Sequence, residues 1–363
     1  MDNCNCRRGN SRLVLRSFSN DLVQTRLAVI VLLVGSISTV PVAAQEWESL
    51  GTRALGLAGA FVAVADDATA AYWNPAGLST GSVFSLLFDH AVTETLTDRS
   101  RVASPGTARA GTIIGMSTNT TALSYYRLVI DQVEDYQLGR GTGSETSKER
   151  DSRQRTLRSL VTHNLALTRA TFFGSGFSVG STVRYVRSSV GVNVLGTNIP
   201  TARALHQTIG QGTHSQNHYD LDVGLKTGGP KFQLGLVARN LRNPRLGVPG
   251  ESAFRLGRQV RTGLAVRPAG GLLVTADVDL SPLSAFGGDL RNMAVGAEKR
   301  FGTWLAVRGG ARINVDDVWT NPATVVAFGF SMALTTGIFV DGQWTRGRAG
   351  TENGWSAAGR FSY

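Results

Sequence analysis

The sequence predicts an all-β fold, a transmembrane antiparallel β-barrel of about 14 strands, from three observations. Apolar and polar residues alternate in runs of about 10–15 residues, whereas strands of soluble domains average about 5–6 residues and membrane-crossing strands need about 9–11. The connections between the runs are alternately short and long, as they are between the strands of membrane barrels. The last run ends on an aromatic residue, Tyr363, which is typical of a closing barrel strand.

The alternating runs give the strand boundaries. Residues 272–280 are the clearest example, since Leu272 and Val274 fall on one face while Asp277 and Asp279 fall on the other. In lipid every backbone polar group needs a partner within the protein, so such a sheet must close. We predict strands over residues 82–93, 107–117, 120–131, 156–170, 175–190, 218–227, 231–241, 258–267, 271–281, 290–300, 303–314, 323–333, 336–346 and 354–363.

The polar face of each run is expected to point into the lumen, because the apolar face suits lipid. Charges of both signs occur on this face. They can pair across the interior and simply fill it, or they can contact another part of the chain that enters the lumen. The charged residues expected to face the lumen are Arg184, Asp222, Asp277, Asp279, Glu298, Arg308, Arg312, Asp341 and Arg360.

Residues 1–44 are expected to be a cleaved signal peptide. Basic residues precede an apolar run over residues 27–40, and small residues lead to a cleavage site after Ala44. A membrane anchor is the alternative, but a spanning helix needs about 20 residues. Cleavage would remove both cysteines, Cys4 and Cys6, and lower the formal charge from +11 to +8, since five arginines and two aspartates are lost. The exported chain then has no thiol for disulfide, metal or nucleophile chemistry.

Residues 45–80 do not alternate and are expected to form a plug, ahead of a barrel over residues 81–363. A short helix is predicted over residues 68–73, capped by Asp66 or Asp67. Pro75 disfavours helical geometry at Asn74, and Gly77 permits a tight turn. We predict that Asn74, Pro75, Ala76 and Gly77 fix and gate this plug. The alternative is a cap that only closes the periplasmic mouth.

The stretch over residues 53–79, "RALGLAGAFVAVADDATAAYWNPAGLS", resembles the N-terminal signature of the FadL-like outer-membrane barrels. It is most similar to their PorV/PorQ-type branch. A second stretch, residues 231–244, resembles a strand-to-loop motif of that branch. The resemblance implies a fourteen-stranded barrel plugged by an N-terminal hatch that contains the Asn-Pro-Ala turn. The chain is shorter than FadL proper, and the residues that bind fatty acids there cannot be aligned with positions of this sequence.

Other motifs give weaker signals. His214 and His218, with His206 nearby, have the spacing of helical zinc ligands but occur in a polar loop. Gly-rich stretches lack the full dinucleotide-binding pattern, and no nucleophile elbow occurs, so we expect no enzyme, no cofactor and no metal. Seven arginines over residues 239–267 can bind phosphate, and for an exported chain lipopolysaccharide is a more suitable partner than nucleic acid.

Three functional hypotheses follow. The first is an outer-membrane barrel of the Gram-negative type that passes small hydrophobic compounds. The second, the alternative, is a PorV/PorQ-like barrel that binds and shuttles secreted proteins within a protein secretion system. The third is a structural barrel without cargo. Membrane lipids, lipopolysaccharide and the outer-membrane assembly machinery are the expected partners in each case.

Overall fold

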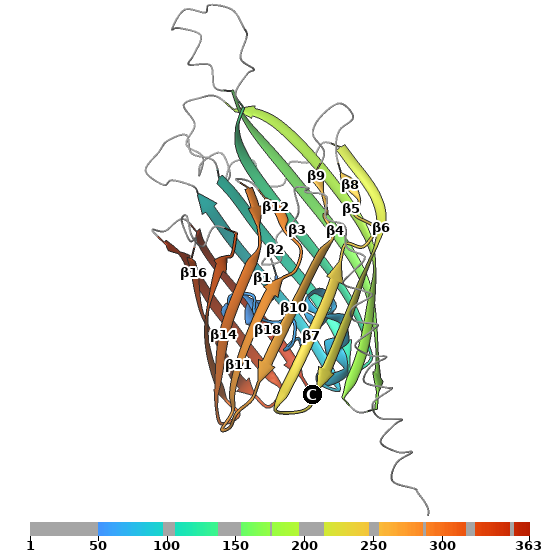
Figure 1. Ribbon diagram of the computed structural model, residues 1–363, viewed down its shortest axis with the longest axis vertical. Helices are drawn as coiled ribbons and strands as arrows, with labels where there is room; N and C mark the ends of the chain where they lie inside the picture. Colours follow the sequence, from blue (N-terminus) through green and yellow to red (C-terminus); the bar gives the residue numbers. More distant parts are fainter. Residues whose placement is uncertain are drawn as a thin grey trace, which may run out of the picture. The chain divides into compact units, whose positions relative to one another are not determined.

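The computed structural model describes residues 50–96, 106–136, 154–174, 176–195, 214–246, 254–285, 288–316, 324–348 and 352–363. Fourteen antiparallel strands form a closed barrel, which confirms the predicted fold class (Figure 1). The barrel strands are β1 Phe84–Leu96, β2 Gly106–Thr118, β3 Thr121–Tyr136, β4 Gln154–Phe173, β5 Phe177–Leu195, β6 His214–Gly228, β7 Phe232–Arg239, β10 Gln259–Val266, β11 Leu272–Asp279, β14 Asn292–Phe301, β15 Leu305–Asn314, β16 Thr324–Thr335, β17 Ile338–Gly347 and β18 Glu352–Ser362.

The last strand closes the barrel against the first. β18 pairs antiparallel with β1, and two backbone hydrogen bonds join their ends: Phe84 N donates to Tyr363 O at 3.1 Å, and Tyr363 N donates to Phe84 O at 2.9 Å. The sheet therefore has no open edge, which satisfies the requirement that backbone groups in lipid be paired. The C-terminus lies at the end with the short turns (Figure 1), here called the short-turn end.

The two faces of the wall differ as the alternation predicted. In β14, buried and exposed residues alternate strictly from Asn292 to Glu298, and a similar alternation occurs in the neighbouring strands. Large apolar side chains such as Leu167, Phe328 and Trp355 are more than half exposed on the outer face. Buried polar and charged side chains occupy the inner face, so the polar residues of each strand are enclosed by the barrel.

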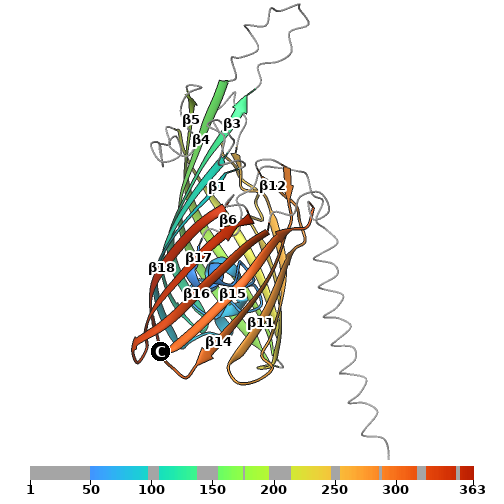
Figure 2. The same ribbon diagram turned by 90° about the vertical axis from the view of Figure 1, so that its left-hand side faces the viewer.

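Two small hairpins were not predicted. β8 Arg245–Leu246 pairs with β9 Phe254–Arg255, and β12 Leu283–Ala285 pairs with β13 Gly288–Leu290. β4 and β5 are also longer than predicted, with 20 and 19 residues. With β3 they extend beyond the other strands away from the short-turn end (Figure 2).

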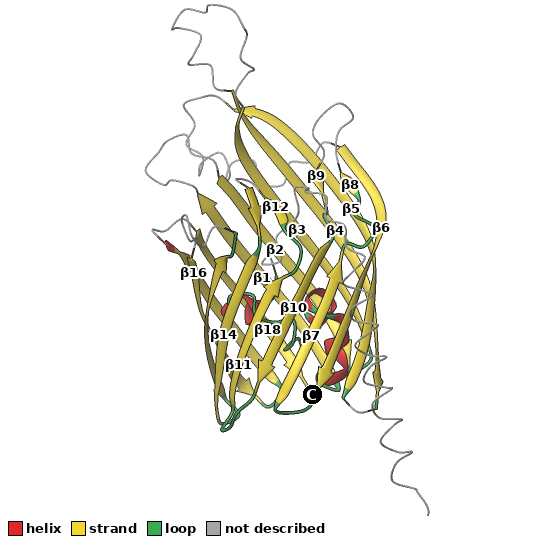
Figure 3. Ribbon diagram, viewed as in Figure 1, coloured by secondary structure: helices red, strands yellow, loops and turns green. Residues whose placement is uncertain are grey.

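Residues 50–80, here called the inner segment, lie inside the barrel near the short-turn end (Figure 3). They form the helices α2 Thr52–Gly56 and α3 Ala70–Trp73 and the 3-10 helix η1 Pro75–Thr80. Nearly all of their side chains are buried, and Phe61, Tyr72 and Trp73 form the centre of the apolar core. Within the described ranges, no helix has the length and apolar character needed to cross a membrane. The expected signal peptide and the start of the expected plug lie outside these ranges.

Candidate functional site

The Asn-Pro-Ala-Gly stretch joins two helical turns of the inner segment. Asn74 ends α3 in an extended conformation and caps η1, because its Oδ1 accepts a hydrogen bond from Ala76 N at 3.1 Å. Its Nδ2 donates to Val62 O at 2.9 Å and to Leu225 O of β6 at 3.2 Å. Pro75 occupies the first position of η1, where no backbone donor is needed. One side chain thus fixes the turn and ties it to the wall.

Glycine is required here by close approach and not by turn geometry. Gly77 was expected to permit a tight turn, but it lies within η1 and has no positive φ. A Cβ on Gly77 would lie 1.9 Å from Ala65 O. Two wall glycines face the same stretch: a Cβ on Gly180 of β5 would lie 2.3 Å from Ala76 N, and one on Gly224 of β6 would lie 2.1 Å from Asn74 Oδ1. Here the backbone of the inner segment rests directly on the backbone of the wall.

Two wall carboxylates bind backbone N–H groups of the inner segment. Asp89 of β1 accepts from Gly51 N at 3.2 Å and from Thr52 N at 2.6 Å, at the start of α2. Asp277 of β11 accepts from Phe61 N and Val62 N, both at 2.8 Å. Buried N–H groups outside regular structure need such acceptors. The role of Asp89 was missed, although its position on the polar face of the first predicted strand could have indicated it.

Lys226 of β6 supplies the complementary interaction. Its Nζ donates to Val64 O at 2.9 Å and to Thr80 Oγ1 at 2.8 Å, and its side chain is buried. Wall side chains therefore satisfy both donors and acceptors of the irregular backbone.

Arg53 of α2 is the centre of a buried ion network. Its Nε donates to Glu298 Oε2 at 3.0 Å and its Nη2 to Glu298 Oε1 at 3.1 Å, a two-point contact of the kind guanidinium groups favour. Arg53 also pairs with Asp66. Burial opposes the ionised form of Asp66, but Arg53 and Lys226 outweigh it and hold the pKa of this carboxyl below its usual range. Burial instead raises the pKa of Asp67, against the opposing effect of Arg53.

The predicted lumen residues fall into separate groups. All except Arg360 are buried, and the Arg360 side chain is 14% exposed. Near the short-turn end, Arg308 lies 3.4 Å from Glu298 and 3.7 Å from Asp341, and Arg360 lies 3.4 Å from Asp341. These four residues share one network with Arg53.

The other predicted charges lie further from that end. Arg184 contacts Asp220 and Asp222, both at 2.9 Å, as part of a buried cluster with Asn240. The remaining two predicted residues pair with wall partners that were not predicted: Arg312 with Glu352 at 2.7 Å, and Asp279 with Arg261 at 2.6 Å.

The predicted arginine cluster over residues 239–267 does not form one surface. Arg239 and Arg261 are buried on the inner face. The Arg239 guanidinium lies 3.8 Å from the ring centroid of Tyr72 in α3, and Arg261 pairs with Asp279. The expectation that these two bind lipopolysaccharide is therefore wrong, because alternate residues of a strand point to opposite faces.

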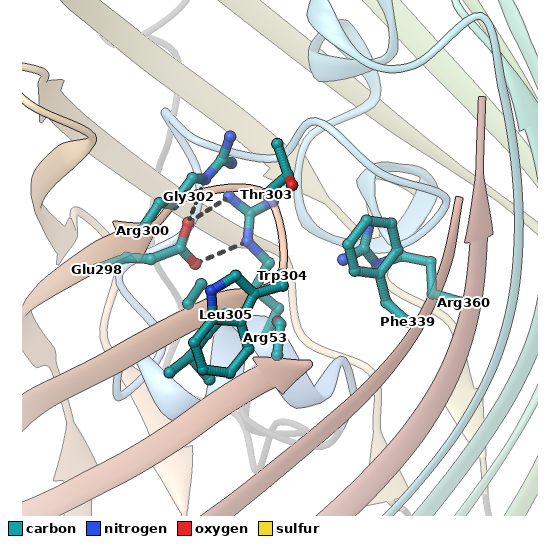
Figure 4. A pocket seen from close by; sticks show the side chains of 11 residues that line it. Arg53, Glu298, Arg300, Gly302, Thr303, Trp304, Leu305, Phe339 and Arg360 are labelled. Carbon is teal, nitrogen blue, oxygen red and sulfur yellow. Dashed lines mark hydrogen bonds and ion pairs between the residues drawn. The ribbon is translucent and has the colours of Figure 1, made fainter. Parts of the chain in front are cut away.

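A pocket of about 330 Å3 lies between Arg53 of α2 and the wall at the short-turn end (Figure 4). Arg53 and Glu298 border it on one side, and Phe339 and Arg360 lie together on another. The Arg360 guanidinium lies 4.4 Å from the Phe339 ring centroid. This cavity is here called the mouth pocket. It is lined by Arg53, Glu298, Arg300, Gly302, Thr303, Trp304, Leu305, Ala306, Ser331, Phe339 and Arg360.

The histidines do not support a zinc site. His214 and His218 both lie on strand β6, and His206 falls outside the described residues. Across the described part of the chain, no three His, Cys, Asp or Glu residues come together in a way that could hold a metal ion.

Comparisons with known proteins identify the fold. The chain is similar to the monoaromatic hydrocarbon channel CymD, with 14% identity, a TM-score of 0.61, and 88% of this chain and 99% of that chain covered. It is similar to the Ralstonia pickettii toluene transporter TbuX, with 15% identity, a TM-score of 0.55, and 88% and 99% covered. It is also similar to a Pseudomonas aeruginosa FadL homologue, with 11% identity, a TM-score of 0.56, and 89% and 99% covered. The chain thus has the FadL-type barrel fold, as its resemblance to that family implied.

Sequence comparison adds one partial match. A family described as "F plasmid transfer operon, TraF, protein" matches residues 102–279, which is less than half of the chain. That range runs from β2 to β11 and omits both the inner segment and β14 to β18. No curated protein matches the sequence.

Proposed function

We propose that this protein is an outer-membrane channel for small hydrophobic compounds, with the inner segment as its plug. The observation that carries the proposal is the way the lumen holds this segment. Asp89, Asp277 and Lys226 bind its backbone from different sides of the barrel, and its own Asn74 donates to Leu225 O of β6. The fold is shared with proteins described as hydrocarbon channels and toluene transporters, which supports this class of cargo.

The proposed location follows from the wall. Its outer face carries a broad band of exposed Leu, Phe, Val, Met and Trp side chains, more than a soluble barrel would leave in water. In a membrane barrel the short turns face the periplasm and the longer loops face outward. The short-turn end, with the C-terminus and the mouth pocket, is then periplasmic. Export by a signal peptide over residues 1–44 completes the proposal.

The route past the plug would run on the α2 side. The mouth pocket lies between α2 and strands β14 to β18, and the Arg53–Glu298 pair forms its border with the interior. Charged side chains can exchange partners or take up water, whereas close backbone contacts, such as those at Gly180 of β5 and Gly310 of β15, leave no such freedom. A hydrophobic compound that crosses the barrel would therefore leave through the mouth pocket.

Plug removal tests this proposal. Conductance through planar bilayers should be low for the exported protein and high and steady after residues 45–79 are deleted. Replacing both Asn74 and Pro75 by Ala should give an intermediate, flickering conductance, because three hydrogen bonds of the Asn74 side chain are lost. Heat-modifiable gel migration verifies that each barrel has assembled. An assembled deletion variant with unchanged conductance would show that the segment never blocked the lumen.

Uptake assays test the cargo. Cells that depend on this barrel should accumulate a radiolabelled monoaromatic hydrocarbon faster than cells without it. Equal rates, with the barrel present in the outer membrane, would count against hydrophobic transport. The secretion alternative predicts instead that loss of the gene changes which proteins reach the cell surface. The partial match to a plasmid-transfer family omits the inner segment, and we base no function on it.

A further inference from the structure

Three basic side chains lie next to one another on the outer face of the barrel: Arg127 of β3, His163 of β4 and Arg187 of β5. The strand register pairs Arg127 with His163 and His163 with Arg187, so they occupy adjacent positions on adjacent strands. Figure 2 shows these strands side by side. The chain neighbours of the three, such as Tyr126 and Asn164, are buried in the interior, so the three side chains point outward.

The surroundings of this row, here called the basic row, are apolar and aromatic. The next outward positions toward the short-turn end are Tyr125, Leu165 and Tyr185, which are 41%, 51% and 38% exposed. Tyr125 OH lies 2.7 Å from His163 Nδ1, which holds the imidazole on the surface. On the opposite side the next positions are Val129, Val161 and Ser189, which carry no charge.

The basic row lies at one border of the apolar band. On β5, Arg187 lies ten positions after Phe177, which is at the short turn. At a rise of about 3.3 Å per residue and a tilt of about 40°, this corresponds to about 25 Å, the usual height of the lipid-facing band. Given the proposed orientation, the short turn marks the periplasmic border, and the basic row marks the outer border.

Cations at this border need an anion. Charged side chains on a lipid-facing wall are costly unless they reach the interface or a counter-charge. Among the described residues, neither Arg127 nor Arg187 forms an ion pair with a carboxylate. Two guanidinium groups with an imidazole between them match the oxygens of a phosphate group. In the outer leaflet of this type of membrane, the phosphates belong to lipid A.

We propose that Arg127, His163 and Arg187 form a binding site for a lipid A phosphate of the outer leaflet. The site rests on the proposed outer-membrane location but not on the channel activity. It replaces the arginine cluster that the sequence had indicated for lipopolysaccharide. The phosphate would accept hydrogen bonds from both guanidinium groups, and the acyl chains would lie against Leu165 and Val183, the latter 53% exposed.

Lipid binding to the purified protein in detergent tests the site. Native mass spectrometry with added diphosphoryl lipid A should show binding at least about tenfold tighter than dephosphorylated lipid A, since charged hydrogen bonds are the strong ones. The double variant Arg127→Gln/Arg187→Gln should lose this difference. Arg169→Gln is the matched control. Arg169 is exposed on the same outer face of β4, nearer the short turn, and donates to Thr121 Oγ1 at 3.0 Å.

Each result of the lipid-binding experiment either supports or contradicts the proposed lipid A site. Lipid A binding to the double variant at wild-type strength would overturn the proposal. Equally tight binding of phosphatidylglycerol through the same arginines would identify a phospholipid headgroup and also overturn it. Heat-modifiable migration verifies folding, and the single variant Arg187→Gln serves if the double variant does not assemble. The lipid-binding measurement does not depend on whether the protein is a channel. Bilayer conductance of these variants should equal that of the wild type.

Discussion

The two sides of the inner segment are held by different kinds of contact. On the β5 and β6 side, η1 rests backbone against backbone at Gly180 and Gly224. On the β14 to β18 side, α2 is held mainly through the side chains of Arg53, Glu298 and Arg308, with a pocket of about 330 Å3 beside them, and its end at Leu57 packs closely against Gly310 of β15. Closely packed backbones cannot be rearranged at low cost in free energy. The side chains of an ion network can exchange partners. We infer that the η1 side is the more fixed of the two and that the ion network beside the mouth pocket is where the segment can loosen.

Glu298→Gln should have the largest effect on this comparison. The substitution removes the carboxylate shared by Arg53 and Arg308 and leaves buried guanidinium groups short of charge, a change that typically costs about 3–5 kcal/mol. The plug should loosen on the α2 side, so channel openings in planar bilayers should become much more frequent. Asp316→Asn is the control, because Asp316 pairs with Arg291 at the surface. If the Glu298 variant opened no more often than the wild type, the idea that the ion network is the mobile side would be contradicted.

Gly180→Ala should disturb the fixed side in another way. The new Cβ would lie 2.3 Å from Ala76 N, so either the strand or the inner segment must shift, at a cost of about 1–3 kcal/mol. We expect a lower temperature for the heat-dependent gel shift, with little change in channel openings. Gly359→Ala in β18 is the matched control, since its Cβ would meet nothing within 4 Å. Equal gel-shift temperatures for the two variants would show that the contact at η1 is not tight.

Arg300→Gln should have the smallest effect. Arg300 lies at the edge of the mouth pocket, 3.4 Å from Glu298, but its side chain is 57% exposed. Exposed ion pairs contribute about 0–1 kcal/mol, so both the gel-shift temperature and the channel openings should stay near wild type. A strong increase in openings would extend the mobile side to the rim of the pocket.

The wall could be predicted from the sequence because its two faces meet different solvents. Every strand that separates lumen from lipid must alternate, so the boundaries of β14 and β15 follow from residue types alone. The cap at Asn74 was also predictable, because it depends on neighbours in the chain. The path of the inner segment was not, since Asp89 and Gly224 define it from strands far away in the sequence. The hairpins β8–β9 and β12–β13 are too short to show a period.

The pairing of the first and last strands encloses a segment that precedes both of them in the chain. The inner segment precedes β1 and contacts β4 to β6 on one side and β16 to β18 on the other. Once Phe84 and Tyr363 have exchanged their backbone hydrogen bonds, the ring of strands is complete around it. A segment that is in place before β18 arrives can act as a template on which the early strands gather. In a chain without the inner segment, the strands would have to assemble while Asp89, Asp277 and Lys226 faced an empty interior.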